Sequence, residues 1–378
     1  MRCVFGVVLL GALGALAPQL GASSAQPAKE PLLKAVTPPA GQVRVRVPLA
    51  EGMTKAIQMR AQVPHPKKKG ETIEITVALD TINRSMVTAK MLENWGYPAP
   101  TGKTFVLPEL LIVGNQLAPK SAKGSDVLVR ITNLKMDVIE AAPDGGSQLF
   151  NADMVMLLPD LLKVASRPAE PRFHFNERFL DLTIPPTLVR RPGTGEEPMP
   201  EPEAPPDPKL ATVACPLSLT PGLSFTSASV NGTDTFHMPD GKTHTVVPML
   251  ASCTHGGNGV IMNIGMARAL KLDVDLTKDA TAGMSTDKKL RLIEYKLKEL
   301  RVGVLSGPGL KVAQELVFTD IPIWIEVIDS DPGLWIGYPF IATHFKDAVL
   351  AITPDGTAKL HGRVNPELIK DPRPKKKP

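Results

Sequence analysis

Residues 71–97 constrain the fold of this chain more than any other stretch. Apolar side chains there alternate with polar or small ones at Ile73, Ile75, Val77 and Leu79. This period of two predicts a strand with one buried face. The strand ends at Asp80, and after a short loop the apolar residues at helical spacing predict a helix near residues 91–97. A carboxylate at the end of a buried strand is costly unless it is paired or used, so Asp80 is the first candidate functional residue.

The bulk composition predicts about two globular domains joined by proline-rich connectors. The chain has 378 residues, of which 43% are hydrophobic, 21% are charged and 38 are prolines, and such a length exceeds one typical domain. The first 25 residues have a basic start, an apolar core and a small-residue cleavage site, as secretory signals do. We therefore expect a secreted or periplasmic protein. No other run is long and apolar enough to span a membrane.

The charge pattern argues against nucleic-acid binding. The formal net charge is +5 at pH 7, but much of the excess lies in short lysine and arginine runs at residues 67–69 and 373–377. Only 4% of the residues are aromatic, too few to supply the stacking surface that single-stranded nucleic acid needs. Solvated surface charge accounts for the excess, and the expected partner is a peptide or protein ligand.

A proline-rich stretch at residues 191–209 marks the clearest domain boundary. Many of its residues lack the backbone N–H that a helix or sheet requires, so it predicts an extended acidic linker. The expected organisation is signal peptide 1–25, tether 26–42, first lobe 43–187, linker 188–209, second lobe 210–363 and basic tail 364–378.

The second lobe repeats the order of the first, which predicts a duplicated all-β unit of about 150 residues, a normal size for one domain. Residues 266–272 match 91–97 in character, and residues 334–341 match 154–162, with Pro339 standing where Pro159 stands. Gly, Asn, Pro and Ser residues between the apolar runs predict separate short strands. The expected pairs of strands are 127–132 and 134–140, 290–295 and 297–304, and 316–318 and 323–327.

Around Asp80 the sequence predicts a β-hairpin that leads into two hydrophobic residues and Asp80-Thr81, followed by a loop, an apolar run and a helix. This order resembles the aspartic protease family in its retroviral-like (retropepsin-like) and pepsin-like forms. Trp335-Ile336-Gly337 is similar to the family's later element of two hydrophobic residues and a glycine. The resemblance covers residues 43–182 and 212–360, which is nearly the whole chain after the expected signal peptide. It implies two tandem aspartic-protease-like β-barrel lobes with short helices, joined by the proline-rich linker.

The motifs depart from those of active family members, which use one aspartate from each lobe. The two acids share a proton, so that one acts as a base while the other polarises the carbonyl. In the first lobe Ile82 replaces the glycine of Asp-Thr-Gly, and Val155-Met156-Leu157 replaces the glycine element. In the second lobe Cys253-Thr254-His255, or alternatively His255-Gly256-Gly257, stands in place of the motif, without an aspartate.

Three functions remain open at this point. The favoured one is a non-catalytic pseudoprotease, without a cofactor, that binds an extended peptide or a partner in the cleft between the lobes. The second is an aspartic peptidase in which Asp80 pairs with Asp80 of another chain in a homodimer, or works with His255 as a base. The third is a metal site at His237, His244, Cys253 and His255, in which His237 and His244 are expected to face each other across a hairpin.

The candidate site residues follow from these alternatives. The catalytic candidates are Asp80, Thr81 and His255, and the binding candidates are Cys253, Thr254 and Gly337. Asp80 also has a structural interpretation as a buried acid that caps the following loop. Cys215 and Cys253 form either a disulfide or two buried thiols, because sequence does not give the distance between their Cα atoms.

Overall fold

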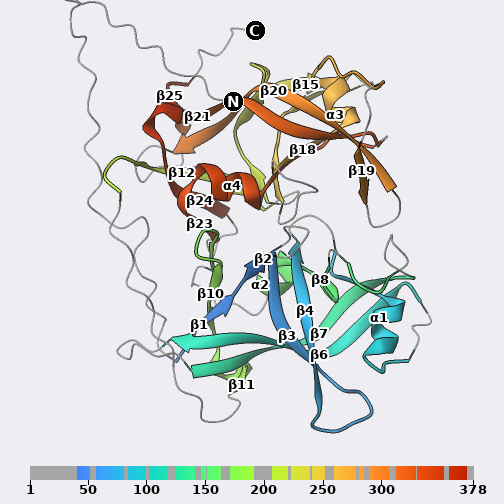
Figure 1. Cartoon of the computed structure of the whole chain (residues 1–378). Helices are drawn as coiled ribbons and strands as arrows, with labels where there is room; N and C mark the ends of the chain where they lie inside the picture. Colours follow the sequence, from blue (N-terminus) through green and yellow to red (C-terminus); the bar gives the residue numbers. More distant parts are fainter. Residues whose placement is uncertain are drawn as a thin grey trace, which may run out of the picture.

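The computed structural model describes most of the chain after the predicted signal peptide and tether. The described residues are 41–51, 57–80, 84–98, 102–117, 125–140, 146–149, 151–162, 171–190, 207–219, 223–238, 241–251, 259–277, 281–284, 289–305, 312–328, 330–352 and 357–372. Strands dominate them, with four short α-helices, which confirms the all-β prediction (Figure 1). Within these residues no helix has the length and apolar character needed to cross a membrane.

The first half of the structure comprises residues 43–190. Its elements are β1 (Val43–Pro48), β2 (Ala50–Glu51), β3 (Ile57–Pro64), β4 (Thr72–Asp80), β5 (Met86–Thr88), α1 (Ala89–Asn94), β6 (Thr104–Leu117), β7 (Ser125–Ile139), β8 (Met154–Leu157), α2 (Leu158–Leu162), β9 (Arg172–His174), β10 (Phe179–Ile184), η1 (Pro186–Leu188) and β11 (Val189–Arg190).

The second half comprises residues 211–370. Its elements are β12 (Ala211–Ser218), β13 (Ser224–Phe225), β14 (Ala228–Val230), β15 (Thr235–His237), β16 (Thr243–Thr245), β17 (Met249–Ala251), β18 (Val260–Asn263), α3 (Ile264–Ala269), β19 (Thr281–Met284), β20 (Lys289–Leu305), β21 (Val312–Glu326), β22 (Leu334–Gly337), α4 (Tyr338–His344), β23 (Lys346–Ile352), β24 (Thr357–Val364), η2 (Pro366–Leu368) and β25 (Ile369–Lys370).

The local sequence explains the elements around β4. Its alternate apolar residues enter the core, and the strand pairs antiparallel with β3 in the predicted hairpin, from Pro64↔Thr72 to Gln58↔Ala78. Thr88 caps α1 by accepting a hydrogen bond from the Met91 N–H, and Asn263 caps α3 in the same way from the Met266 N–H. Short polar side chains at this position satisfy a backbone donor that the helix leaves unpaired.

The strand pairings repeat from one half to the other. β4 runs parallel to β8 as β17 runs parallel to β22. β5 runs parallel to β7 as β18 runs parallel to β21. Each half then ends in a short 3-10 helix and a strand, β11 on β7 and β25 on β21. Residues 366–370, which we assigned to the basic tail, are therefore part of this ordered pattern.

The longest strands correct the prediction of separate short ones. Residues 125–139 form one strand, as do 289–305 and 312–326. Asn133 and Asp320 adopt positive φ values of 54° and 56°, and neither has a cross-strand partner at the point where its neighbours pair. Asn and Asp tolerate this left-handed conformation better than most residues, so the chain kinks there and the ladder continues on both sides.

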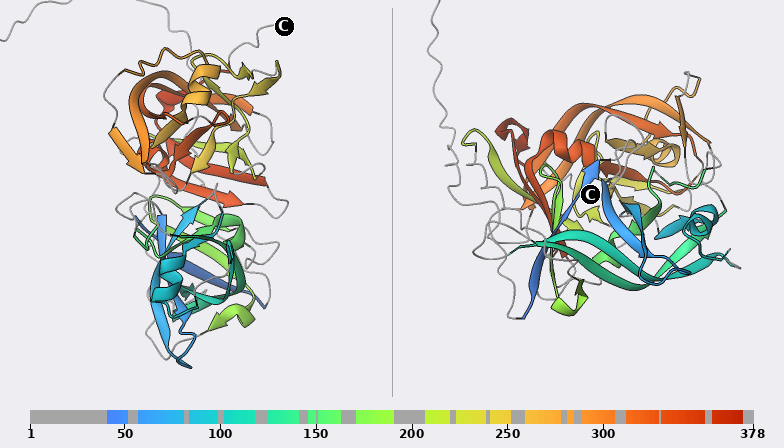
Figure 2. Two further views of the ribbon diagram at one scale, coloured as in Figure 1. Left: turned by 90° about the vertical axis from the view of Figure 1, so that its right-hand side faces the viewer. Right: turned by 60° about the horizontal axis from the view of Figure 1, so that its bottom comes forward.

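A six-stranded sheet joins the two halves. Its order is β1, β10, β9, β23, β24 and β12, with three strands from each half. The junction is the antiparallel pairing of β9 with β23, from Val349↔His174 to Ala351↔Arg172. In Figures 1 and 2 the two halves stack on either side of this junction. One face of the sheet is buried in the core through Val47, Leu180, Phe173, Leu350 and Leu360.

Candidate functional site

Asp80 is the last residue of β4 and is 2% exposed. It lies opposite Leu157, the last residue of β8, and α2 begins at the next residue. The structure thus places the carboxylate where the sequence predicts it, at the end of a buried strand. Thr81, the second catalytic candidate of this motif, lies outside the described residues.

Ser85 and Asp160 hold the end of β8 beside Asp80, and the sequence analysis did not single them out. The Ser85 hydroxyl donates to Asp160 Oδ2 at 2.6 Å and accepts from the Leu157 N–H at 2.9 Å. Ser85 is 3% exposed. The bond to Leu157 fixes the residue that pairs with Asp80, so Ser85 positions the strand end rather than a ligand. No local signal marks these residues, because their contact depends on the β4–β8 pairing.

Ala251 occupies the position in the second half that corresponds to Asp80. It is the last residue of β17 and lies opposite Gly337, the last residue of β22, and α4 begins at the next residue. Asp80 and Leu157 have the same relation in the first half. Ala251 is 4% exposed. The expectation that Cys253-Thr254-His255 fills this position is therefore corrected by the register, and those three residues lie outside the described part of the chain.

Gly337, the binding candidate of the second half, supports the start of α4. Its N–H donates to the Gly259 carbonyl at 2.5 Å, and it caps the helix with extended backbone. Gly259 has φ +74°, and a Cβ atom there would lie 2.4 Å from the Phe340 nitrogen. This close approach of loop and helix requires glycine at position 259.

The space between the two halves near Asp80 is apolar. A cavity of about 20 Å³ lies there, which is room for a single water molecule. Its lining residues are Ile57, Leu79, Leu158, Phe173, Phe175, Leu250, Ala251 and Leu350. They come from both halves, and none of them is titratable. Within the described residues, the second half therefore contributes only apolar side chains where a second aspartate would be needed.

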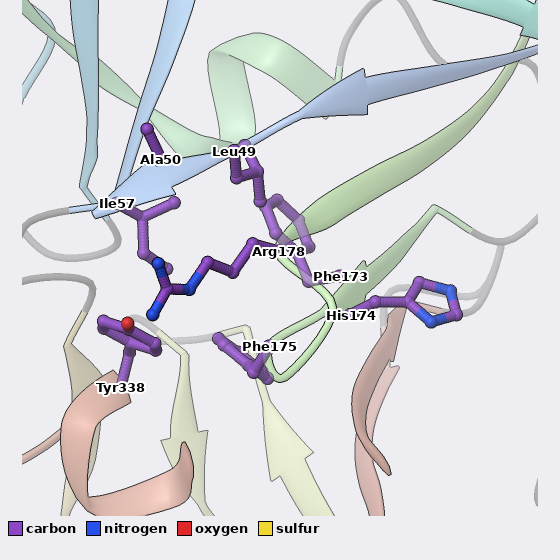
Figure 3. Close-up of a pocket in the computed structure, with 8 residues that line it drawn as sticks. All are labelled: Leu49, Ala50, Ile57, Phe173, His174, Phe175, Arg178 and Tyr338. Carbon is purple, nitrogen blue, oxygen red and sulfur yellow. The ribbon is translucent and has the colours of Figure 1, made fainter. Parts of the chain in front are cut away.

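A neighbouring cavity of about 10 Å³ lies between Ile57 and Tyr338. Figure 3 shows the Arg178 side chain reaching between these two residues, whereas His174 points away from them. Phe175 stacks on Tyr338 with ring centroids 6.2 Å apart. Both cavities are too small for a peptide side chain, so any ligand would have to lie outside them.

His237 and His244 do not have the arrangement that we expected for a metal site. His237 lies opposite Thr243, whose hydroxyl is 3.0 Å from His237 Nδ1, and His244 lies opposite Phe236. Successive residues of a strand point to opposite faces, so His237 and His244 do not face each other as we expected. Cys253 and His255 lie outside the described residues. Where the structure describes the chain, no group of three or more metal-ligating side chains occurs.

Cys215 is a free thiol in the core, 0% exposed, on the buried face of the six-stranded sheet. Burial raises its pKa to about 12. Because the thiolate is the reactive form, we expect no alkylation of Cys215 by iodoacetamide in the native protein at pH 8, and full alkylation in denaturant. Mass spectrometry of the Cys215 peptide measures both. Rapid native labelling would contradict this burial.

Comparison with known proteins finds similarity to solved structures only. No family model matches the chain, and no curated protein matches it. Among solved structures, a retropepsin-like aspartic protease from Rickettsia conorii aligns with 41% of this chain and 93% of its own length. The identity is 17% and the TM-score is 0.24.

Proposed function

We propose that this chain is an aspartic-protease-like protein that does not hydrolyse peptides and that binds an extended peptide between two lobes, the halves described above. The observation that carries the proposal is Ala251 at the position equivalent to Asp80. The two-carboxylate mechanism needs a like-charged pair whose pKa values are split. An alanine methyl group supplies no second acid, and the described residues that line the cavity around it are apolar and supply no substitute.

The homodimer alternative is disfavoured by the junction between the halves. Two Asp80 carboxylates from separate chains could meet only if the second half moved away from the first. The β9–β23 pairing opposes that movement. The Asn176 side chain opposes it too, because it donates to the Ala342 and Phe345 carbonyls and accepts from the Ala348 N–H of the second half.

Peptide binding is supported by the edge of β19. This strand pairs with β20 from Thr281↔Leu292 to Met284↔Lys289, and no other partner is found among the described strands. In Figure 1 the β19–β20 hairpin extends from the second half toward the first. An unpaired strand edge offers backbone donors and acceptors to which an extended peptide can add.

A peptide library tests the proposal. Wild type and Asp80→Asn are incubated with it from pH 3 to 7, and cleavage and binding are measured by mass spectrometry and fluorescence anisotropy, with the oligomeric state recorded by light scattering. We expect no cleavage by either chain and peptide affinities within about twofold of each other, because Asp80 is buried. Cleavage by wild type that is lost in Asp80→Asn would overturn the non-catalytic assignment. Absence of any peptide binding would overturn the assigned ligand class.

A further inference from the structure

Two histidines lie on either side of the strand at which the halves join. His174 of β9 and His361 of β24 both pair with Val349 of β23, one from each side. Residues paired across antiparallel strands share a face of the sheet, so both histidines lie on the face opposite to the one that contains Phe173 and Leu350. Strands lie about 4.8 Å apart, so the two positions are about 10 Å apart. Each histidine is therefore next to the junction.

The junction is short, and His174 is covered within it. β9 has three residues, and its ladder with β23 has three residue pairs. The His174 side chain is 18% exposed and stacks on the Phe179 ring with centroids 4.0 Å apart. In the described part of the chain its buried Nε2 atom has no hydrogen-bond partner, and Asp181 Oδ2 lies 3.8 Å away. A proton on this imidazole would place a charge in a covered site without a hydrogen bond to compensate for it.

The acid beside His174 already binds two arginines. Asp181 is 2% exposed and accepts from Arg44 and from Arg46 Nε, the latter at 3.1 Å. The Arg46 guanidinium also lies 3.6 Å from the centroid of the Phe179 ring, on which His174 stacks. A charged imidazole would therefore lie beside two cations, and the carboxylate that could stabilise it is shared by both.

The strands around both histidines present cations to them. Apart from Asp181, the charged groups that act on the imidazoles are Arg44 and Arg46 of β1, Arg172 of β9 and Lys359 of β24. The strands on either side of β24 place uncharged residues opposite His361, Val349 of β23 and Ala214 of β12. Asp347, near the start of β23, binds Arg363 of β24. Protonation of either imidazole would add a positive charge next to those of the arginines and the lysine.

These surroundings keep both imidazoles neutral while β9 is paired with β23. Burial lowers the pKa of His174 from 6.5 to about 4; Asp181 opposes this effect, and the arginines add to it. Burial lowers the pKa of His361 from 6.5 to about 4 as well, and Lys359 and Arg172 lower it further. The paired junction therefore binds fewer protons than the separated one. Its stability is fully present above about pH 6.5 and is lost as the pH falls from 6.5 toward 4.

We propose that the junction of the halves is an acid-operated switch: on acidification His174 and His361 take up protons, β9 separates from β23 and the halves come apart. The switch lies in the six-stranded sheet and depends neither on Asp80 nor on peptide binding. Acidification would also open the space between the halves in which we place the peptide.

Small-angle X-ray scattering of the full chain at pH 7.5 and pH 4.5 tests the switch. We expect a larger radius of gyration at pH 4.5, an unchanged strand signal in circular dichroism, and recovery of the compact form on return to pH 7.5. The double variant His174→Gln/His361→Gln does not take up these protons and should stay compact at pH 4.5. The matched control His237→Gln/His244→Gln removes two exposed histidines of the β15–β16 hairpin and should expand as the wild type does.

NMR titration of the histidine resonances gives a second readout, because protonation of His174 and His361 should occur over the same pH interval as the expansion. If the double variant does not fold at pH 7.5, the single variant His361→Gln should lower the midpoint pH of the expansion by at least about half a unit. A wild type that stays compact at pH 4.5, expansion of the double variant at the same pH, or expansion with loss of the strand signal would overturn the proposal. So would histidines that are already protonated at pH 7.5.

Discussion

Replacing Gly259 by alanine is expected to destabilise the protein by about 2–4 kcal/mol, or to prevent folding, because two costs act together. The residue has φ +74°, a conformation that alanine adopts at a cost of about 1 kcal/mol. The added Cβ atom would also lie 2.4 Å from the Phe340 nitrogen, and overpacking of this kind costs about 1–3 kcal/mol more. Helix α4 would have to move away from the loop that precedes β18.

Gly241→Ala is the matched control for this prediction. Gly241 has φ +81°, yet nothing lies within 4 Å of the Cβ position. The Gly241→Ala variant should lose only about 1 kcal/mol of unfolding free energy, because only the conformational cost applies there. Urea denaturation of both variants gives the free energies of unfolding, and their difference isolates the contact with Phe340. Equal losses would show that α4 does not approach Gly259 as described, and a Gly259→Ala chain recovered only unfolded would agree with the prediction.

Replacing Asn176 by alanine is expected to cost about 3 kcal/mol and to loosen the junction between the halves. The Asn176 side chain accepts from the Ala348 N–H at 2.7 Å and donates to the Phe345 and Ala342 carbonyls at 3.2 Å and 3.4 Å. All three partners belong to the second half. Each partly buried backbone group left without a hydrogen bond costs about 1 kcal/mol or more.

The Asn176 prediction is checked by urea denaturation of the full chain, followed by tryptophan fluorescence and circular dichroism. We expect a lower midpoint and, if the halves uncouple, two transitions in place of one. Asn94→Ala is the control, because Asn94 is an exposed residue at the end of α1 and such changes cost less than about 0.5 kcal/mol. An Asn176→Ala variant as stable as this control would contradict the role of Asn176 in the junction.

The local pattern of apolar side chains was sufficient to predict much of the fold. The alternation at residues 73–79 predicted β4, and the spacing of Met91, Leu92 and Trp95 predicted α1. The position of Asp80 at a buried strand end followed from the same stretch. These features depend on neighbours in sequence, where the side-chain periods of strands and helices are directly readable.

One sequence signal was present and missed. Ile184 to Arg190 reads I-P-P-T-L-V-R, and Val364 to Lys370 reads V-N-P-E-L-I-K. Both segments form a 3-10 helix followed by a strand, η1 with β11 and η2 with β25. The two are the same closing element of the repeat, and comparing the ends of the predicted lobes would have revealed it. It would also have moved the start of the basic tail beyond residue 370.

The separate strands predicted on either side of Asn133 show where a turn-favouring residue leads to a wrong prediction. Asn is common in turns, so a break at this position was a reasonable expectation. The partner strand continues past it, and the ladder on both sides outweighs the cost of one left-handed residue. Asp320 gives the same result in the second half. Whether such a residue ends a strand depends on its partner strand, which lies elsewhere in the chain.

Sequence by itself determined the β3–β4 hairpin, helix α1, the duplicated order and the buried acid at Asp80. Only the tertiary structure decided that Ala251 is its counterpart, because that equivalence rests on the pairing of β17 with β22 across more than 80 residues and not on any motif. The same holds for the junction of the halves. β9 has three residues, too few for a recognisable pattern, and its partner β23 lies at the far end of the chain. Contacts between residues so far apart in the sequence form only when the whole sheet assembles. No local periodicity of side chains in the sequence indicates them.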